Sequence, residues 1–470
     1  MAVARLRQSY AAISPAAPIR LAKRTSNLFR PRVATRIPGL DVSRLDGVVS
    51  IDAAARTADV QGMCTYEDLV DATLPHGLIP LVVPQLRTIT LGGAVSGLGI
   101  ESTSFRSGLP HDSVLEVDVL TGAGEVVTAT AENEHADLFA AFPNSFGSLG
   151  YATRLRIRLE QVRSHVALRH LRFDDAGLLT KTLAAIVETR EHDGHRVDGL
   201  DGVSFEPGEL YLTLARWTDA LPLVEEGVQG RTSVPEEVAH QPSRRARNPV
   251  SDYTGQQIYY RSIQQRETDL LSTHDYLWRW DTDWFWCSGA FGLGDPRVRR
   301  LWPRRWRRSD VYHRLVALDR RLGVVKRLDR RGGRPQREHV IQDVEVPVER
   351  LPDFLAWFDA EIGMRPVWLC PVVTTRSWPT YPLEPGRTYV NVGFWGTVHV
   401  GADAAKAPLN RAIEAKVHEL GGHKSLYSEA FYDRATFDAL YDGANLAALG
   451  QRYDPDDRLT SLYDKVVRRR

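Results

Sequence analysis

The fold of this chain is decided by the stretch Pro84-Gln85-Leu86-Arg87-Thr88-Ile89-Thr90-Leu91-Gly92-Gly93-Ala94-Val95-Ser96-Gly97-Leu98-Gly99-Ile100-Glu101-Ser102. Four glycines fall within eight positions, beside small and β-branched residues, and no lysine accompanies them. This composition favours a backbone surface pressed against a flat or pyrophosphate-bearing ligand, because a Cβ atom would collide there. The stretch is neither a Walker loop nor a Gly-x-Gly-x-x-Gly dinucleotide fingerprint. A glycine run can also mark a bulge or tight packing, so this stretch alone leaves both interpretations open.

The segments around the glycine stretch form an ordered series of predicted elements. Residues 108–127 alternate apolar and polar positions on both sides of a glycine turn, which predicts a hairpin. A short helical pattern at 137–142 leads to a second glycine-containing loop at 144–153 and a strand at 154–159. Upstream of the stretch, 47–62 predicts another hairpin and 66–74 an amphipathic helix.

In this order the elements resemble the FAD-binding domain of the PCMH type, the fold of vanillyl-alcohol oxidase. The resemblance implies an α+β fold in which two glycine loops lie along the pyrophosphate and isoalloxazine of a non-covalently bound FAD. The cofactor-binding residues that it implies are Pro84, Thr90, Gly92, Gly93, Ala94, Gly97, Gly99, Ile100, Gly147, Ser148, Gly150 and Tyr427.

The N-terminal lobe that normally begins this fold is shortened here. Residues 19–22 predict a strand, and residues 23–29 stand where the first FAD loop should be. The polar and cationic side chains of this segment could bind phosphate oxygens, and they are Lys23, Arg24, Thr25, Ser26 and Asn27. The alternative is a solvated basic turn.

Motifs nearer the C-terminus resemble the Δ24-sterol reductase branch of this superfamily. They are Val340-Ile341-Gln342-Asp343-Val344-Glu345-Val346-Pro347, Pro366-Val367-Trp368-Leu369-Cys370-Pro371, Leu426-Tyr427-Ser428 and residues 437–443, together with Gly99-Ile100-Glu101-Ser102. Bacterial members of the branch include an actinobacterial reductase that converts a 10-methylene fatty acyl chain into the 10-methyl (tuberculostearic) chain. The arginine and alanine richness of the present chain favours that relative.

The resemblance implies an FAD-dependent reductase of a lipid carbon–carbon double bond, with NADPH as electron donor and a methyltransferase of the same pathway as partner. Three alternatives stay open. One is reduction of a sterol or isoprenoid, another is oxidation of a lipid or sugar alcohol, and the third is a flavin-free lipid-binding scaffold.

Bulk composition limits the remaining classes of function. The 470 residues, 43% of them apolar, are enough for two domains. We predict an FAD-binding domain over 1–160, an α+β substrate-binding cap over 161–424 and a C-terminal segment, 425–470, that returns to the FAD domain. Sixty basic residues balance 59 acidic ones, which argues against nucleic acid.

Cysteine spacing and hydropathy indicate the cellular setting. Three cysteines without Cys-x-x-Cys spacing argue against a zinc site and suit a reducing cytosol. Residues 191–195 superficially suggest metal ligands, but they lie at a helix end in a polar segment, which favours a solvated turn. No run of 18 apolar residues predicts a membrane span, and residues 1–20 lack the apolar core of a signal peptide. We therefore expect a cytoplasmic protein, without a metal, that reaches membrane lipid peripherally.

Three residues are predicted to take part in catalysis, since flavin enzymes need a proton source as well as an oriented cofactor. Glu101 follows the glycine stretch, and a carboxyl buried beside lipid would have a raised pKa, so it is the first choice of proton donor. Cys370 lies on an apolar strand that the resemblance places at the flavin, although a buried structural thiol is an equal alternative. Tyr427 matches a flavin-contacting tyrosine of related sugar-lipid oxidases. Ala430 stands where those oxidases have a lysine, which argues against their route of alcohol oxidation.

The stretch 278–308 differs from the rest of the chain. It holds six of the eleven tryptophans, and seven arginines crowd into residues 297–308. Such a segment suits a membrane interface, with Trp at headgroup level and Arg on anionic phosphates. The alternative is a solvated arginine-rich helix beside a tryptophan core. Residues 225–250 and 323–337 lack periodicity and predict basic surface loops.

Overall fold

The computed structural model describes residues 2–23, 29–30, 38–219, 250–322, 337–401 and 403–468. The predicted phosphate-binding residues Arg24, Thr25, Ser26 and Asn27 lie outside these ranges. So do the two predicted basic loops, except for Val250 and Arg337.

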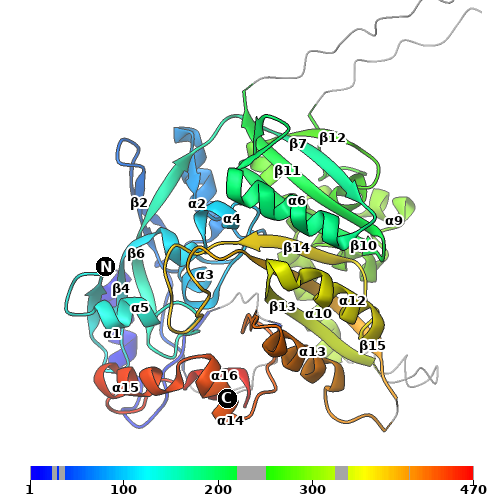
Figure 1. The fold of residues 1–470 in the computed structure, drawn as a ribbon. Coiled ribbons are helices and arrows are strands. Elements are labelled where there is room, and N and C mark those ends of the chain that lie inside the picture. The colour runs from blue at the N-terminus through cyan, green and yellow to red at the C-terminus, as the bar shows by residue number, and fades with distance from the viewer. Residues whose placement is uncertain are drawn as a thin grey trace, which may run out of the picture.

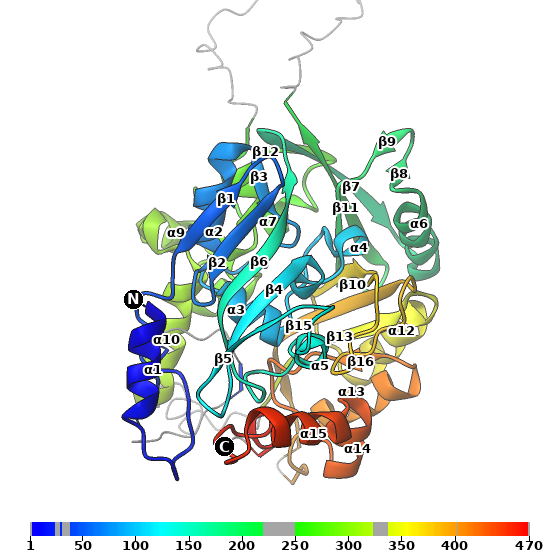
Figure 2. The same cartoon turned by 90° about the vertical axis from the view of Figure 1, so that its left-hand side faces the viewer.

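The N-terminal half is built on a six-stranded antiparallel sheet of order β1-β2-β6-β4-β5, with β3 paired to β6 (Figure 2). Its strands are β1 (Val48–Asp52), β2 (Thr57–Gln61), β3 (Leu78–Pro80), β4 (Val114–Leu120), β5 (Val126–Ala129) and β6 (Tyr151–Gln161). The central strand β6 alternates buried Leu155 and Ile157 with exposed Arg156 and Arg158, because successive side chains point to opposite faces. The predicted hairpins and the strand at 154–159 are confirmed.

Short helices connect and flank these strands. They are α1 (Ala2–Ala11), α2 (Tyr66–Thr73), η1 (Leu74–His76), α3 (Leu91–Gly97), α4 (Ser104–Ser107), η2 (Pro110–Ser113) and α5 (Ala136–Ala141). The predicted glycine loop is therefore helical in part, because the Thr90 side chain accepts the Gly93 N–H and starts α3. The strand predicted at 19–22 is reduced to a single bridge between Leu21 and Leu40.

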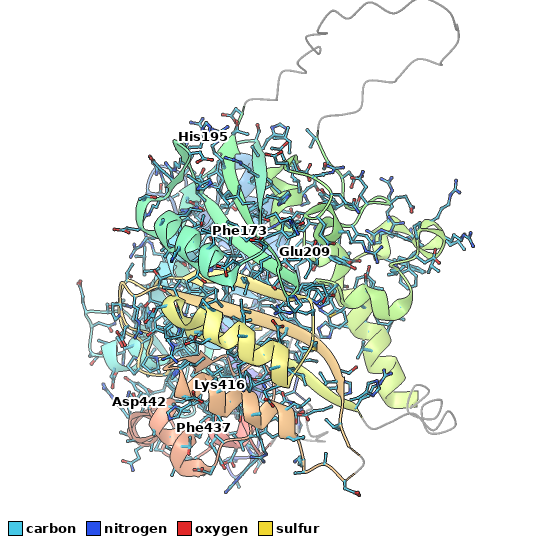
Figure 3. All side chains as sticks on the ribbon, turned by 45° about the vertical axis from the view of Figure 1, so that its right-hand side comes forward. Phe173, His195, Glu209, Lys416, Phe437 and Asp442 are labelled. Carbon is cyan, nitrogen blue, oxygen red and sulfur yellow. The ribbon has the colours of Figure 1, made fainter. Side chains whose placement is uncertain are left out.

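The second half is built on an eight-stranded antiparallel sheet of order β12-β7-β11-β10-β14-β15-β13-β16. Its strands are β7 (His165–Phe173), β10 (Gly199–Glu206), β11 (Glu209–Thr218), β12 (Thr268–Ser272), β13 (Arg337–Pro347), β14 (Val367–Val372), β15 (Tyr389–His399) and β16 (His423–Lys424). The turn at 191–195 forms the small hairpin of β8 (Glu191–His192) and β9 (His195–Arg196). Helices α6 (Ala176–Thr189), α12 (Leu351–Glu361) and α13 (Pro408–Glu419) cover the outer face of the sheet (Figure 3).

The long connection between β12 and β13 contains residues 278–308, here called the Trp/Arg stretch. It runs through α8 (Thr273–Leu277), η3 (Asp281–Asp283), η4 (Cys287–Phe291), α9 (Pro296–Leu301), η5 (Arg304–Trp306) and α10 (Ser309–Leu322), and α7 (Tyr259–Ser262) precedes β12. A further turn, η6 (Val348–Arg350), follows β13. Figure 1 shows α9 at the outer edge of the second half.

The C-terminal helices return to the first sheet. These are α14 (Arg434–Leu440), α15 (Gly443–Tyr453) and α16 (Leu462–Val466), drawn in red beneath the N-terminal half in Figure 1. The Tyr453 hydroxyl donates to Asp137 of α5 at 2.8 Å. One buried cluster contains side chains of both sheets, among them Val60, Leu155, Val203 and Trp368. Two antiparallel sheets with segregated helices confirm the predicted α+β class.

Candidate active site

A cavity of about 830 Å³ lies where the two sheets and the C-terminal helices meet. This volume falls in the range of ligand pockets, about 300–1,000 Å³. The glycine stretch forms one wall of this cavity. The second sheet and η4 form a second wall, and the segment 457–465 forms a third. The lining residues from the first wall are Pro84, Gln85, Leu86, Ile89, Thr90, Gly93, Ser96, Gly97, Leu98, Gly99 and Ile100.

Cationic side chains from distant parts of the sequence line part of this cavity. The Lys23 ammonium donates to Thr90 Oγ1 at 2.9 Å. The Arg30 guanidinium lies over the Phe146 ring, 4.7 Å from its centre. Lys465 Nζ donates to the carbonyl of Gly147 at 2.7 Å. These cations suit a ligand that carries phosphate groups.

The glycine wall leaves room for a ligand to approach the backbone. A Cβ atom at Gly93 would lie 2.8 Å from Thr90 Oγ1 and 3.6 Å from Lys23 Nζ, so any side chain there would enter the space beside the lysine. Leu98, directly after α3, has φ 131° and ψ 155°, a conformation that non-glycine residues rarely adopt. Backbone strain of this kind clusters at ligand-binding sites.

Aromatic rings form another part of the lining. Trp284, Phe285, Trp368 and Trp395 all face the cavity. The Phe285 ring centre lies 4.4 Å from that of Trp395 and 5.6 Å from that of Trp368. Phe29 stacks on Trp284 at 5.7 Å. Such surfaces suit a flat ring system or an apolar chain and exclude water from it.

An acidic and a phenolic group meet at the same part of the cavity. Asp343 on β13 and Tyr427 after β16 both line it. Burial raises the pKa of Asp343 to about 7, although hydrogen bonding from Asn391 and Tyr427 lowers the pKa in part. The Tyr427 hydroxyl accepts a hydrogen bond from Trp395 Nε1 at 2.8 Å. Burial and the nearby Asp343 hold the pKa of Tyr427 well above its usual value.

The residues present therefore fit FAD. Lys23, Arg30 and Lys465 would hold its pyrophosphate, the glycine wall would admit it to close range, and the aromatic surfaces would pack against its ring.

Most of the described residues predicted to bind the cofactor line the cavity. They are Lys23, Pro84, Thr90, Gly93, Gly97, Gly99, Ile100, Gly147 and Tyr427. Four others lie outside the lining. Gly92 and Gly150 permit close backbone packing, because a Cβ atom would lie 2.6 Å from the Gly62 carbonyl oxygen and 2.4 Å from that of Leu120, respectively. Ala94 packs in the core, and Ser148, which follows Gly147 in the sequence, does not line the cavity.

The structure separates two predicted catalytic residues from the cavity. Glu101 is buried and ion-paired with Arg279, at 2.7 Å, and it does not line the cavity. Burial raises its pKa, while Arg279 opposes that effect. Cys370 lies on β14 in the core, two residues from the lining Trp368, and burial holds its pKa well above the usual value. Tyr427 alone of the three faces the cavity.

Several lining residues escaped the sequence analysis. Asp343 stands in the 340–347 motif and Trp284 in the stretch 278–308, while Trp395 and Lys465 carry no motif of their own. Alternation along β13 could have indicated that Asp343 and Glu345 share a face. The contributions of Trp284 and Lys465 depend on long-range packing that spacing does not reveal.

The Trp/Arg stretch divides into a buried and an exposed part. Trp278, Trp280, Arg279, Arg299 and Arg307 are buried, so they are part of the core and cannot contact a membrane. The Arg299 guanidinium donates to backbone carbonyls of Tyr253, Gly255 and Gln257. Among the side chains of this stretch whose burial the structure describes, the exposed ones lie around α9 and η5.

Two further properties concern the part of the chain that the structure describes. Within it, no helix combines the length and apolarity needed to cross a bilayer. The same residues contain no group of three or more His, Cys, Asp or Glu side chains placed to hold a metal ion.

Comparison with known proteins agrees with the geometry of the cavity. Residues 12–130 match the family described as FAD binding domain. The chain is 24% identical over 453 residues to a Delta(24)-sterol reductase of Arabidopsis thaliana, which covers 91% of this chain and 76% of the relative. It is 23% identical over 437 residues to that of Homo sapiens, covering 90% and 76%. Cytokinin dehydrogenase 7 of Oryza sativa subsp. japonica is 32% identical over 188 residues, which covers 39% of this chain and 34% of that protein.

These similarities bear on the sequence predictions. The first half of the chain contains a PCMH-type FAD-binding domain, as predicted. The predicted resemblance to the Δ24-sterol reductases is confirmed over nearly the whole chain.

Proposed function

We propose that this protein is an FAD-dependent reductase of a carbon–carbon double bond in a lipid. The observation that carries the proposal is one cavity in which cations and a glycine wall adjoin an aromatic surface bearing Asp343 and Tyr427. The similarity to Delta(24)-sterol reductases supports reduction of an isolated alkene.

The residues that line the cavity indicate which parts of the reaction the protein performs and which the cofactor performs. FAD, when bound and reduced, supplies a hydride equivalent. The cations hold its phosphates, and the glycine wall fixes its distance from the backbone. Trp284, Phe285 and Trp395 exclude water and orient an apolar substrate. The second hydrogen of the reduced alkene must come as a proton from the protein or from an ordered water.

Within this reaction class we favour a 10-methylene fatty acyl chain of a phospholipid as substrate and its 10-methyl chain as product, with NADPH as electron donor. The apolar lining suits an acyl chain, and the arginine and alanine richness of the chain favours the relative that reduces such a chain. A methylene carbon on the chain must be added by an earlier one-carbon transfer, so a methyltransferase is the proposed partner. Reduction of a sterol or isoprenoid is the second choice, supported by the names of the relatives. Alcohol oxidation is disfavoured, because buried Ala430 stands in place of a lysine.

We also propose that the enzyme meets its lipid at an anionic membrane surface. Three exposed apolar side chains lie within nine residues of α9 and η5: Val298 is 39% exposed, Leu301 86% and Trp306 46%. Exposed cations surround them, namely Arg297, Arg300, Arg304 and Arg305. We call these seven residues the docking patch. Apolar side chains inserted at headgroup level among cations bind anionic lipid.

Two measurements test the proposed function. Purified protein should show flavin absorption bands, which a cofactor-free scaffold lacks. A host that carries the gene should accumulate 10-methyl acyl chains, and a host without it should accumulate their 10-methylene precursors. A host whose acyl chains are unchanged by loss of the gene would contradict the proposed substrate.

A further inference from the structure

Asp343 has a position in the cavity that the sequence did not indicate. It lies in the middle of β13, directly opposite Gly393 of β15. A Cβ atom at residue 393 would lie 2.4 Å from Asp343 Oδ1 and 2.6 Å from the Trp395 ring. The glycine therefore leaves the space in which the carboxyl and the indole lie side by side at the cavity wall.

The carboxyl is held by neutral partners. Asn391 Nδ2 donates to Asp343 Oδ1 at 3.1 Å. The Tyr427 hydroxyl is close enough to lower the pKa of Asp343, while Trp395 Nε1 donates to the tyrosine oxygen at 2.8 Å. Because the indole N–H occupies one lone pair of that oxygen, the phenolic hydrogen stays available to Asp343 or to a substrate in the cavity.

The titratable groups facing Asp343 all have pKa values that burial raises. They are Tyr427 on the segment after β16, Glu345 on the same strand and Cys370 on β14. Burial holds the pKa of Glu345 well above the usual carboxyl value, and the pKa values of Cys370 and Tyr427 are also raised by burial. With burial raising the pKa of Asp343 to about 7, the site favours a protonated carboxyl.

We propose that Asp343 holds the proton that reaches the substrate alkene, and that the Tyr427 hydroxyl touches the substrate and relays it. This inference rests on the proposed function. One alkene carbon gains the Tyr427 proton and the other gains a hydride, so the π bond breaks and two C–H bonds form. Tyr427 takes the Asp343 proton at the same time. The electron pair comes from the reduced FAD, which ends oxidised, and the Asp343 carboxylate regains a proton from water.

The placement favours Asp343 over Glu101 in this role. Glu101 faces Arg279, whose positive charge stabilises the carboxylate, and it lies outside the cavity lining. Within the described part of the chain, the groups that shift the pKa of Asp343 include no cation, and Asp343 lines the cavity. A proton donor must come within hydrogen-bond reach of the reacting atom, directly or through one group.

The first test needs neither substrate nor turnover. An infrared difference titration of the FAD-loaded protein should show a protonated carboxyl band that disappears with a midpoint near pH 7. Asp343→Asn should abolish this band, and Tyr427→Phe should shift its midpoint, because a hydrogen bond to the carboxylate is lost. A band that persists unchanged in Asp343→Asn overturns the assignment.

The second test separates the two half-reactions by stopped flow without oxygen. Asp343→Asn should keep full FAD content and normal flavin reduction by NADPH. The rate of flavin reoxidation by the lipid alkene should fall by about 10²- to 10⁴-fold, which is the usual contribution of general acid catalysis to a rate. Asp343→Glu should recover part of the rate. A near-normal rate of flavin reoxidation in Asp343→Asn overturns this proposal. A wild-type enzyme that shows the carboxyl band but reduces no lipid overturns the proposed function alone.

Discussion

The Arg279 guanidinium lies 2.7 Å from the Glu101 carboxylate, and both side chains are buried where the two sheets meet. The same guanidinium lies 3.0 Å from Asp201 and over the Tyr276 ring at 4.0 Å. Glu101 belongs to the segment that follows the glycine wall, and Arg279 to the segment between α8 and η3 of the second half. The ion pair therefore fixes the glycine wall against this segment beside the cavity.

Glu101→Gln should lower the stability of the fold and have little effect on the rate of alkene reduction. Breaking this pair leaves part of a buried charge without its partner, so we expect the free energy of unfolding to fall by roughly 1–3 kcal/mol. Denaturant unfolding measures this loss, and Glu125→Gln at an exposed position should show none. If Glu101→Gln is fully stable yet loses a hundredfold or more in alkene reduction, Glu101 is the proton donor and the structural role fails.

Gly93→Val should abolish FAD binding while the protein stays folded. The branched side chain would enter the cavity beside Lys23 and displace Thr90. Flavin content of the purified variant, with its circular dichroism spectrum, checks this outcome. Gly450→Val on α15 is the matched control, because a Cβ atom there meets nothing within 4 Å. A Gly93→Val protein with full flavin occupancy would show that this wall does not bind the cofactor.

Several elements could be predicted from the sequence because their signals are local. The hairpins and the helix at 66–74 follow from turn residues and apolar periodicity, whereas the glycine stretch, predicted as a loop, contains helix α3. The separation of Glu101 from the cavity could not be predicted, because it depends on Arg279, 178 residues away. The burial of Arg299 and Arg307 escaped prediction for the same reason, since backbone carbonyls satisfy these cations only in the folded chain.

Removal of charge from the docking patch should weaken membrane binding. Replacing Arg297, Arg300, Arg304 and Arg305 with Gln removes about 1 kcal/mol of attraction to anionic lipid for each cation near the surface. Vesicle sedimentation with phosphatidylglycerol should show the loss, and reduction of a soluble short-chain analogue should be unaffected. The control replaces four exposed cations elsewhere, Arg156, Arg158, Arg172 and Lys181. Equal vesicle binding by the two quadruple variants would exclude the docking patch as the membrane contact.

The free energy of unfolding should depend on pH because of Asp343. Folding raises the pKa of this carboxyl from 3.8 to about 7, so the folded protein binds the proton more tightly than the unfolded chain. The resulting stabilisation is complete below pH 3.8 and is lost as pH rises through about 7. Between pH 3.8 and about 7, the free energy of unfolding of the wild-type protein should fall by roughly 1–3 kcal/mol relative to that of Asp343→Asn. Each pKa unit is worth about 1.4 kcal/mol, and water in the cavity reduces this value.

Urea unfolding at several pH values measures this difference. Asp174→Asn, at an exposed position, provides a control whose unfolding free energy should run parallel to that of wild-type at every pH. Parallel curves for wild-type and Asp343→Asn would show that folding does not raise the pKa of Asp343.

The central claim, reduction of a lipid double bond through FAD, is tested most directly by the product of a single reaction. Purified protein is incubated without oxygen with NADPH and a phospholipid that carries a 10-methylene acyl chain, and the acyl chains are analysed by mass spectrometry. We predict that the chain gains two hydrogen atoms and that the gain depends on bound flavin. An unchanged acyl chain, from a protein whose flavin is fully reduced by NADPH and which also leaves a Δ24-unsaturated sterol unchanged, would contradict the claim.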